Sequence, residues 1–143
     1  MKPNRLNRFS LLCSLICYLI VCCPPTLTAQ QQPREVVRIL AVGNSFSDDG
    51  GEYLDELAKA AGIRLIVGNL YIGGCSLERH WENVSKGLPA YDYRKNCEGV
   101  QSNTPKTSLL SALQDEPWDY ITVQQVSQNS GLYDTYYPFM PSL

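Results

Sequence analysis

The segment GNSFS at residues 43–47 contains the residues best placed for chemistry in this 143-residue chain. It follows an aliphatic run at 36–42 and precedes an amphipathic stretch, so we expect it at a turn between a buried strand and a helix. In open α/β sheets, ligands bind at the carboxyl ends of the strands. A hydroxyl there lies beside the free N–H groups of a helix N-terminus, which can stabilise an oxyanion. Ser45 is therefore a candidate nucleophile.

Other roles for this turn stay open. Ser45 or Ser47 can instead cap the following helix, because serine is a favoured N-cap residue. A phosphate site is disfavoured, since Asp48 and Asp49 would repel an anion and the turn contains neither G-x-x-x-x-G-K-[ST] nor G-x-G-x-x-G. Ser47 also replaces the second glycine of the G-x-S-x-G elbow, which argues against an α/β-hydrolase.

The histidine and cysteine residues offer few alternatives. His80 is the chain's only histidine, and we expect it in a packed position beside Trp81, with general base and metal ligand as alternative roles. No set of His, Cys or Asp residues has the spacing of a metal site, so neither a metal nor another cofactor is expected. Cys75 and Cys97 either form a disulfide after export or remain free thiols.

The N-terminus has the features of a secretory signal peptide. Lys2, Arg5 and Arg8 precede an apolar run at 9–23, and prolines and small residues follow up to Ala29. The run is shorter than the ~20 residues that a membrane-spanning helix needs. We predict a signal peptide over 1–29, a linker over 30–35, and a mature chain that is periplasmic or extracellular and has no membrane contact.

The charge of the chain argues against one class of partner. It has 12 Lys and Arg against 14 Asp and Glu, a net charge of −2, and its basic residues do not cluster beyond the N-terminus. A protein that binds the phosphate backbone needs such a cluster, so no nucleic-acid partner is expected.

Strand and helix patterns alternate around the serine turn. Runs typical of buried strands lie at 36–42, 64–71 and 119–124, and the first two flank a helix pattern whose apolar residues recur at i, i+3, i+4 and i+7. This order predicts a βαβ unit with parallel strands. Residues 91–97 are extended in pattern but polar. Thr104-Pro105 predicts the start of a further helix that ends near Asp115.

Three sequence blocks resemble the SGNH (GDSL-like) hydrolases. They are ILAVGNSFSDDGGEYLDELAKAAG, NLYIGGCSLERHW and WDYITVQQVSQNSG, and the last two resemble an exported bacterial branch often described only as a domain of unknown function. The resemblance covers residues 37–143. It implies a flavodoxin-like three-layer α/β/α fold and hydrolysis of an acyl or acetyl ester, often on a carbohydrate. Residues 36–143, with about three parallel strands, would be the N-terminal portion of such a domain.

The resemblance also assigns roles to single residues. Ser45 matches the nucleophile, with its own N–H as one oxyanion donor, and Gly74 matches the glycine that donates a second N–H. The third donor has no clean equivalent, and either Gln125 or Asn129 can supply it. The Asp-x-x-His segment that holds the family's general base is absent, so we expect this chain to be a truncated esterase, feeble or inactive as it stands. The alternative is a non-catalytic carbohydrate- or peptide-binding module on the same fold.

Overall fold

The structure is a computed structural model that describes residues 35–143. The predicted signal peptide at 1–29 and residues 30–34 of the predicted linker lie outside the described residues. In the part of the chain that is described, no helix has the length and apolar character needed to cross a membrane.

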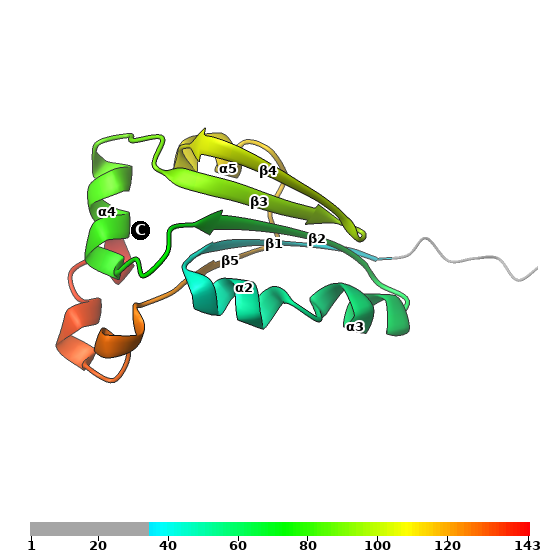
Figure 1. The fold of residues 1–143 in the computed structure, drawn as a ribbon, viewed down its shortest axis with the longest axis horizontal. Coiled ribbons are helices and arrows are strands. Elements are labelled where there is room, and N and C mark those ends of the chain that lie inside the picture. The colour runs from blue at the N-terminus through cyan, green and yellow to red at the C-terminus, as the bar shows by residue number, and fades with distance from the viewer. Residues whose placement is uncertain (1–34) are drawn as a thin grey trace, which may run out of the picture. The chain divides into compact units, whose positions relative to one another are not determined.

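A five-stranded mixed sheet forms the centre of this region, with the strand order β4-β3-β2-β1-β5 (Figure 1). β1 (Val36–Gly43) lies between β2 (Arg64–Tyr71) and β5 (Tyr120–Val123) and is parallel to both. β3 (Tyr91–Cys97) and β4 (Val100–Thr107) extend the sheet beyond β2 as an antiparallel hairpin. β1 is therefore covered by strands on both edges, as its aliphatic sequence indicates.

This sheet overturns the predicted flavodoxin-like three-layer fold. That fold needs a parallel sheet, whereas β3 pairs antiparallel with both β2 and β4. Glu98 and Gly99 connect β3 and β4 with positive φ angles of 54° and 94°, and so short a turn can join only antiparallel strands. Residues 91–97, extended in pattern but polar, are thus the strand β3 and one arm of a hairpin.

The helix predicted to start at Thr104-Pro105 is also wrong in its first part. Residues up to Thr107 belong to β4, and the helix that follows is the shorter α5 (Leu109–Leu113), capped by Ser108. β4 is an edge strand, and Pro105 falls at a register shift where it has no partner in β3, so its missing N–H costs no hydrogen bond within the sheet. The Thr-Pro signal therefore fits the end of an edge strand as well as the start of a helix.

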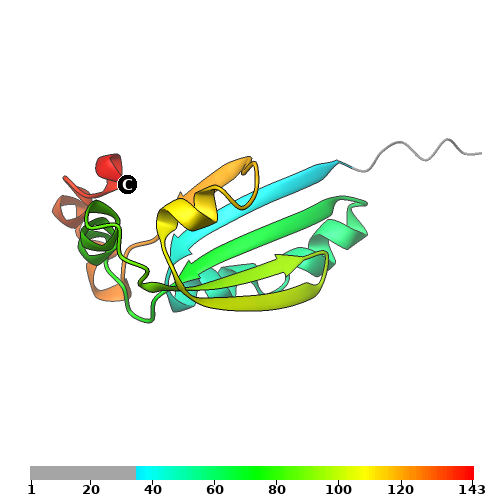
Figure 2. The ribbon, with the colours of Figure 1, turned by 90° about the horizontal axis from the view of Figure 1, so that it is seen from above.

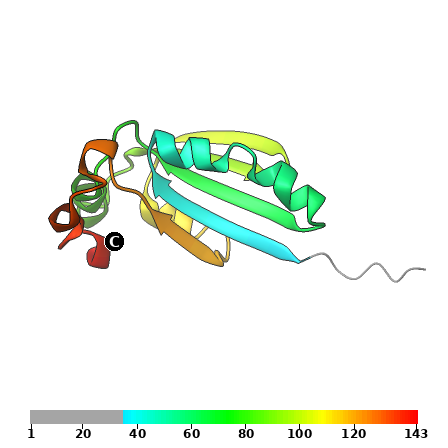
Figure 3. The same cartoon turned by 90° about the horizontal axis from the view of Figure 1, so that it is seen from below.

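The helices lie on two faces and at one end of the sheet. α2 (Ser45–Gly51) and α3 (Leu54–Ala60) run along one face, and α5 lies on the opposite face (Figures 2 and 3). α4 (Leu77–Ser85) lies beyond the carboxyl ends of β1 and β2 (Figure 1). Three short 3₁₀ turns at the same end complete the described chain: Ser127–Asn129, Tyr133–Tyr136 and Met140–Ser142.

The apolar core lies on the α5 face of the sheet. Trp118 packs against it and donates from Nε1 to the Ala112 carbonyl oxygen at 2.8 Å. Gly68 permits this contact, since a Cβ atom there would lie 2.8 Å from the Trp118 ring. The buried members of this core come from β1, β2, β3 and α5: Leu40, Val42, Leu70, Tyr91, Tyr93, Leu109 and Ala112. By contrast, neither α2 nor α3 has a buried residue.

Candidate active site at the carboxyl end of β1

The turn after β1 presents Ser45 to solvent. β1 ends at Gly43 and α2 begins at Ser45, so Asn44 is the only residue between the strand and the helix. Asn44 has an extended backbone, and its Oδ1 accepts from the N–H of Phe46 at 3.1 Å, which makes it the N-cap of α2. The alternative that Ser45 or Ser47 caps this helix is therefore wrong. Ser45 is its first residue and is exposed.

Asn44 also ties together the three segments that the sequence blocks single out. Its side chain is buried, and its Nδ2 donates to the carbonyl oxygen of Cys75 at 3.1 Å and to that of Gln125 at 3.4 Å. These two residues follow the neighbouring strands β2 and β5. A buried amide is stable only when its donors and acceptor are paired, and here all of them are used. The carboxyl ends of three parallel strands are thereby fixed around Ser45.

The two serines of the turn have different surroundings. Ser47 is half-buried, and its Oγ lies 2.6 Å from the Asn44 carbonyl oxygen and 2.9 Å from Oδ1 of Asn69. Within residues 35–143, the hydroxyl of Ser45 has no hydrogen-bond partner. Ser47 therefore has a structural contact to make, whereas the Ser45 hydroxyl is available to a ligand.

The predicted backbone donors of the oxyanion site are unpaired. The N–H groups of Ser45 and Gly74 donate no hydrogen bond to another described residue. Gly74 is exposed and has φ +60°, a conformation that favours glycine, in the turn that leads from β2 to α4. Cys75, which follows Gly74, is bonded through its carbonyl oxygen to Asn44. The Gly74 turn is thus attached directly to the Ser45 turn.

The two candidates for the third donor differ. The Gln125 side chain is buried and fully engaged: Oε1 accepts from the N–H groups of Leu77 at 3.0 Å and Val126 at 2.9 Å, and Nε2 donates to Thr135. It holds α4 and the 3₁₀ turns in place. The side-chain amide of Asn129 makes no hydrogen bond within the described part of the chain. Of the two, only Asn129 has a side-chain donor to offer without losing an existing contact.

His80 occupies the packed position that the sequence predicts, although its neighbour is Tyr91 rather than Trp81. Its ring is fully buried and stacks on Tyr91 with a centroid distance of 5.7 Å, and Nδ1 lies 3.2 Å from the Tyr91 hydroxyl. Burial, with a smaller effect of nearby Arg79, lowers the pKa of His80 to about 4. A sealed, neutral imidazole cannot take a proton from a solvent-exposed serine.

The two cysteines of the described region are not joined in a disulfide. Cys75 and Cys97 are both free thiols, the first buried and the second exposed near the hairpin turn. Burial raises the pKa of the Cys75 thiol to about 11, so it is protonated at neutral pH and is no nucleophile. Among the described residues, no group of three or more His, Cys, Asp or Glu is arranged to hold a metal ion.

Comparison with known proteins identifies the family. Residues 38–143 match the family described as "Domain of unknown function (DUF4886)". The chain belongs to the DUF4886 family. It is similar to the crystal structure of a DUF4886 family protein from Bacteroides uniformis, with 49% sequence identity and a TM-score of 0.72. The match covers 76% of this chain and 42% of that chain, so this chain spans less than half the length of that DUF4886 protein. No curated protein matches.

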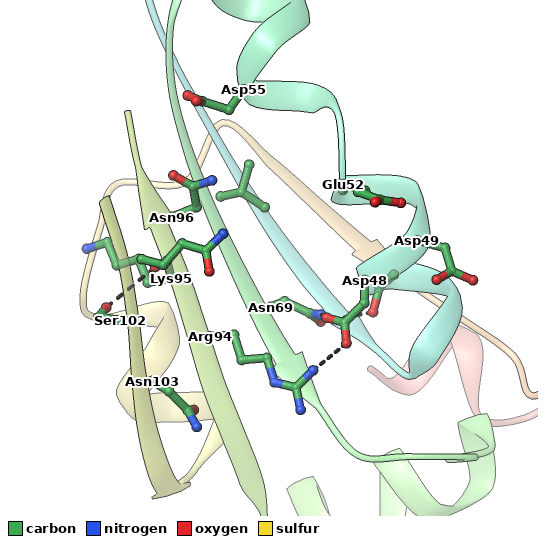
Figure 4. Close-up of a pocket in the computed structure, with 14 residues that line it drawn as sticks. Asp48, Asp49, Glu52, Asp55, Asn69, Arg94, Lys95, Asn96, Ser102 and Asn103 are labelled. Atoms are coloured by element: carbon green, nitrogen blue, oxygen red, sulfur yellow. Dashed lines mark hydrogen bonds and ion pairs between the residues drawn. The ribbon is translucent and has the colours of Figure 1, made fainter. Parts of the chain in front are cut away.

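A polar groove of about 780 Å³ lies on the α2/α3 face of this DUF4886 domain (Figure 4). It is walled by α2 and α3 on one side and by β3 and β4 on the other, because the two helices cover only part of the sheet. Ser47 and Asp48 lie at its edge, and Ser45 is not part of its lining. Arg94 reaches across the groove to pair with Asp48 and lies 3.6 Å above the Tyr71 ring.

Three residues of this site were missed in the sequence. Asn44 supports the turn, Asn69 bonds Ser47, and Arg94 holds Asp48. Asn69 gave a usable signal, since it is the polar residue in the otherwise apolar centre of RLIVGNLY. A buried amide in such a strand needs partners, and those partners lie on whichever element covers it. Arg94 gave no signal of this kind, because charged residues are frequent throughout β3.

Proposed function

We propose that this protein supplies the nucleophile and two backbone oxyanion donors of an SGNH-type serine esterase. One observation carries the proposal: the Ser47 hydroxyl is committed to structural contacts, while the hydroxyl of Ser45, two residues earlier, is exposed and has no partner within residues 35–143. The N–H groups of Ser45 and Gly74 are likewise unpaired in the described part. A free hydroxyl beside free amide donors is the arrangement that acyl transfer requires.

The proposed reaction has two steps. Oγ of Ser45 attacks the acyl carbon of an ester, and the negative charge that develops on the carbonyl oxygen is stabilised by the N–H groups of Ser45 and Gly74. The C–O bond to the alcohol breaks, the serine proton ends on the departing alcohol, and an acyl–Ser45 ester remains. Water then cleaves this ester, which releases the carboxylic acid and restores the hydroxyl.

The substrate class follows from the resemblance of the three sequence blocks to the SGNH hydrolases. We propose a small acyl or acetyl ester, including one carried on a carbohydrate, and an exported location for the protein. The protein from Bacteroides uniformis is more than twice as long as its matched region, and we propose that efficient turnover belongs to DUF4886 proteins of that length. Because His80 is sealed in the core, we expect this chain to acylate Ser45 slowly, without a histidine base.

The proposal is tested by a fluorophosphonate probe, which forms a stable adduct with a reactive serine. We expect slow labelling of the protein at Ser45, located by mass spectrometry of the peptide that contains residues 39–52. Ser45→Ala should abolish this adduct. Hydrolysis of 4-nitrophenyl acetate gives a second readout, and its Ser45-dependent part should disappear in the same variant.

Ser102→Ala is the matched control. Ser102 lies in β4, and its hydroxyl makes only a 3.5 Å contact with the Lys95 carbonyl oxygen. We expect this variant to label at the wild-type rate. Failure of the wild-type protein to label, or equal labelling of Ser45→Ala, would contradict the proposal. The first of these results would favour the non-catalytic carbohydrate- or peptide-binding module.

A further inference from the structure

We propose that Ser47 and Asn69 are positioning residues that fix the Ser45 turn on the sheet. The catalytic part of this inference rests on the proposed function, in which Ser45 is the reacting residue. Its structural part, that a polar network and not apolar packing holds the turn, is independent of any activity.

The helix α2 contributes no fully buried side chain to the apolar core. It is seven residues long, contains two glycines, and none of its residues is buried. A helix of this length is unstable alone, so its position must come from tertiary contacts. Two hydrogen bonds join its first turn to the sheet: the Ser47 hydroxyl donates to Asn69 Oδ1, and Asp48 accepts from Asn69 Nδ2. The location of Ser45 at the start of the helix therefore depends on these polar side chains.

Asn69 is the sheet residue that hydrogen-bonds both Ser47 and Asp48. It lies in β2 with 6% of its surface exposed, and its Nδ2 donates to Oδ1 of Asp48 at 2.6 Å. A carboxylate only accepts hydrogen bonds, so this contact fixes which end of the Asn69 amide points to Asp48. The amide oxygen faces the Ser47 hydroxyl, 2.9 Å away, whose single proton is shared between this oxygen and the Asn44 carbonyl oxygen. The orientation of one buried amide thus sets the position of two helix residues.

The network is anchored at its far end by Arg94. The Arg94 guanidinium pairs with Asp48 (Figure 4) and stacks on Tyr71, so Asp48 is held from β3 as well as from Asn69 in β2. Side chains of β2, β3 and α2 therefore interlock at the edge of the polar groove. Within this network, the Asn69 amide, the Asp48 carboxylate and the Ser47 hydroxyl each have a partner, which favours a rigid arrangement.

At its near end, the network reaches the residue that precedes Ser45. The Ser47 Oγ lies 2.6 Å from the carbonyl oxygen of Asn44. It also lies directly over Gly43, where any Cβ atom would overlap it. Ser47 thus closes the turn onto the last residue of β1. Without its hydroxyl, or without Asn69 as acceptor, the turn keeps the Asn44 contacts to Cys75 and Gln125 but loses the contact that joins the first turn of α2 to β2.

The test compares Ser47→Ala and Asn69→Leu with the wild-type protein in two measurements. The rate of fluorophosphonate labelling at Ser45 should fall by about tenfold to a hundredfold, because reaction depends steeply on the position of the nucleophile. Amide hydrogen exchange at Phe46 and Ser47, whose N–H groups both donate to Asn44, should accelerate by about fivefold to tenfold. Ser47→Thr keeps the hydroxyl and should restore both quantities.

Asn103→Leu and Ser102→Ala are the matched controls. Both residues line the same groove from β4, and both variants should keep wild-type labelling and exchange. If Ser47→Ala and Asn69→Leu behave like these controls while Ser45 still labels, the positioning role is refuted and the proposed function stands. If no protein labels at Ser45 but exchange accelerates and Ser47→Thr reverses it, the proposed function fails and the positioning of the turn is supported. Should Asn69→Leu not fold, the three proteins with Ser, Ala or Thr at position 47 decide the question.

Discussion

The two faces of the sheet are held by different forces. On the α5 face, Leu40 and Leu70 are completely buried and pack with the residues of α5. On the α2/α3 face, neither helix buries a residue, and the first turn of α2 is attached through hydrogen bonds of Ser47 and Asp48. Apolar burial is strong but has no direction, whereas hydrogen bonds fix distances and angles. We infer that one face supplies stability and the other supplies geometry.

The largest effect should come from the apolar face. Leu70→Ala removes a side chain with no exposed surface from the centre of the core, and we expect a loss of about 2–5 kcal/mol in the free energy of unfolding. Urea unfolding followed by circular dichroism measures it. Leu57→Ala is the control from the other face, since Leu57 is 63% exposed, and should change stability by less than about 0.5 kcal/mol. Equal losses in the two variants would remove the distinction between the faces.

Acidification should weaken the apolar side through His80. Its pKa is lowered by burial from 6.5 to about 4, so the unfolded chain takes up the proton first as the pH falls. This contribution to stability is complete above pH 6.5 and is lost between pH 6.5 and about 4, by on the order of 3 kcal/mol. Urea midpoints at pH 7, 5.5 and 4 measure the decline. The variant His80→Phe should show a shallower decline, and an identical one would mean that His80 is not buried as a neutral ring.

Two glycines, one before Ser45 at the end of β1 and one after it within α2, should respond in opposite ways. Gly43→Ala places a methyl group against the Ser47 hydroxyl, which we expect to cost about 1–3 kcal/mol and to abolish labelling of Ser45. Gly50→Ala adds a methyl group in α2 with no atom within 4 Å and should raise stability by up to about 1 kcal/mol. Unfolding and labelling of both variants are compared. Normal labelling of Gly43→Ala would show that the close contact between Gly43 and the Ser47 side chain does not control the reactivity of Ser45.

The smallest expected effect is a difference in stability between alanine variants of two serines, Ser108 and Ser45, at the starts of helices on opposite faces of the sheet. Ser108 caps α5 by accepting from the N–H of Ser111 at 3.1 Å, so Ser108→Ala should lose about 1 kcal/mol. Ser45→Ala should leave stability within about 0.5 kcal/mol of wild type, because its hydroxyl makes no contact in the described part of the chain. Thermal unfolding of the two variants measures the difference. A clear loss in Ser45→Ala would assign that hydroxyl a structural role.

Local patterns predicted the elements with the strongest periodicity. The apolar runs at 36–42 and 64–71 are the strands Val36–Gly43 and Arg64–Tyr71, and the run at 119–124 contains Tyr120–Val123. Central strands are recognisable because both of their faces are covered by the same chain. The exposure of Ser45 at the turn after the first strand follows from the same pattern. Its assignment as a nucleophile stays a prediction.

The hairpin and the support of the turn were not predictable in this way. Polar residues of β3 and β4 match no period, since this end of the sheet is exposed on the groove side and ends in an edge strand. The helix pattern at Leu54, Leu57, Ala58 and Ala61 does not report burial either, because none of the residues of α3 is buried. A pattern shows which residues share a face, but what covers that face depends on segments far away in the sequence.

The sequence by itself determined where the central strands run, which turn carries Ser45, and that Gly74 lies in the turn after β2, because each depends on neighbouring residues. Only the tertiary structure decided that the sheet is mixed, that His80 is buried against Tyr91, and that Ser47 rather than Ser45 is committed to Asn69. The physical reason is that hydrogen bonds and burial join residues that are distant along the chain. Asn69 lies 22 residues from Ser47, and the residue types alone do not state that the two side chains meet.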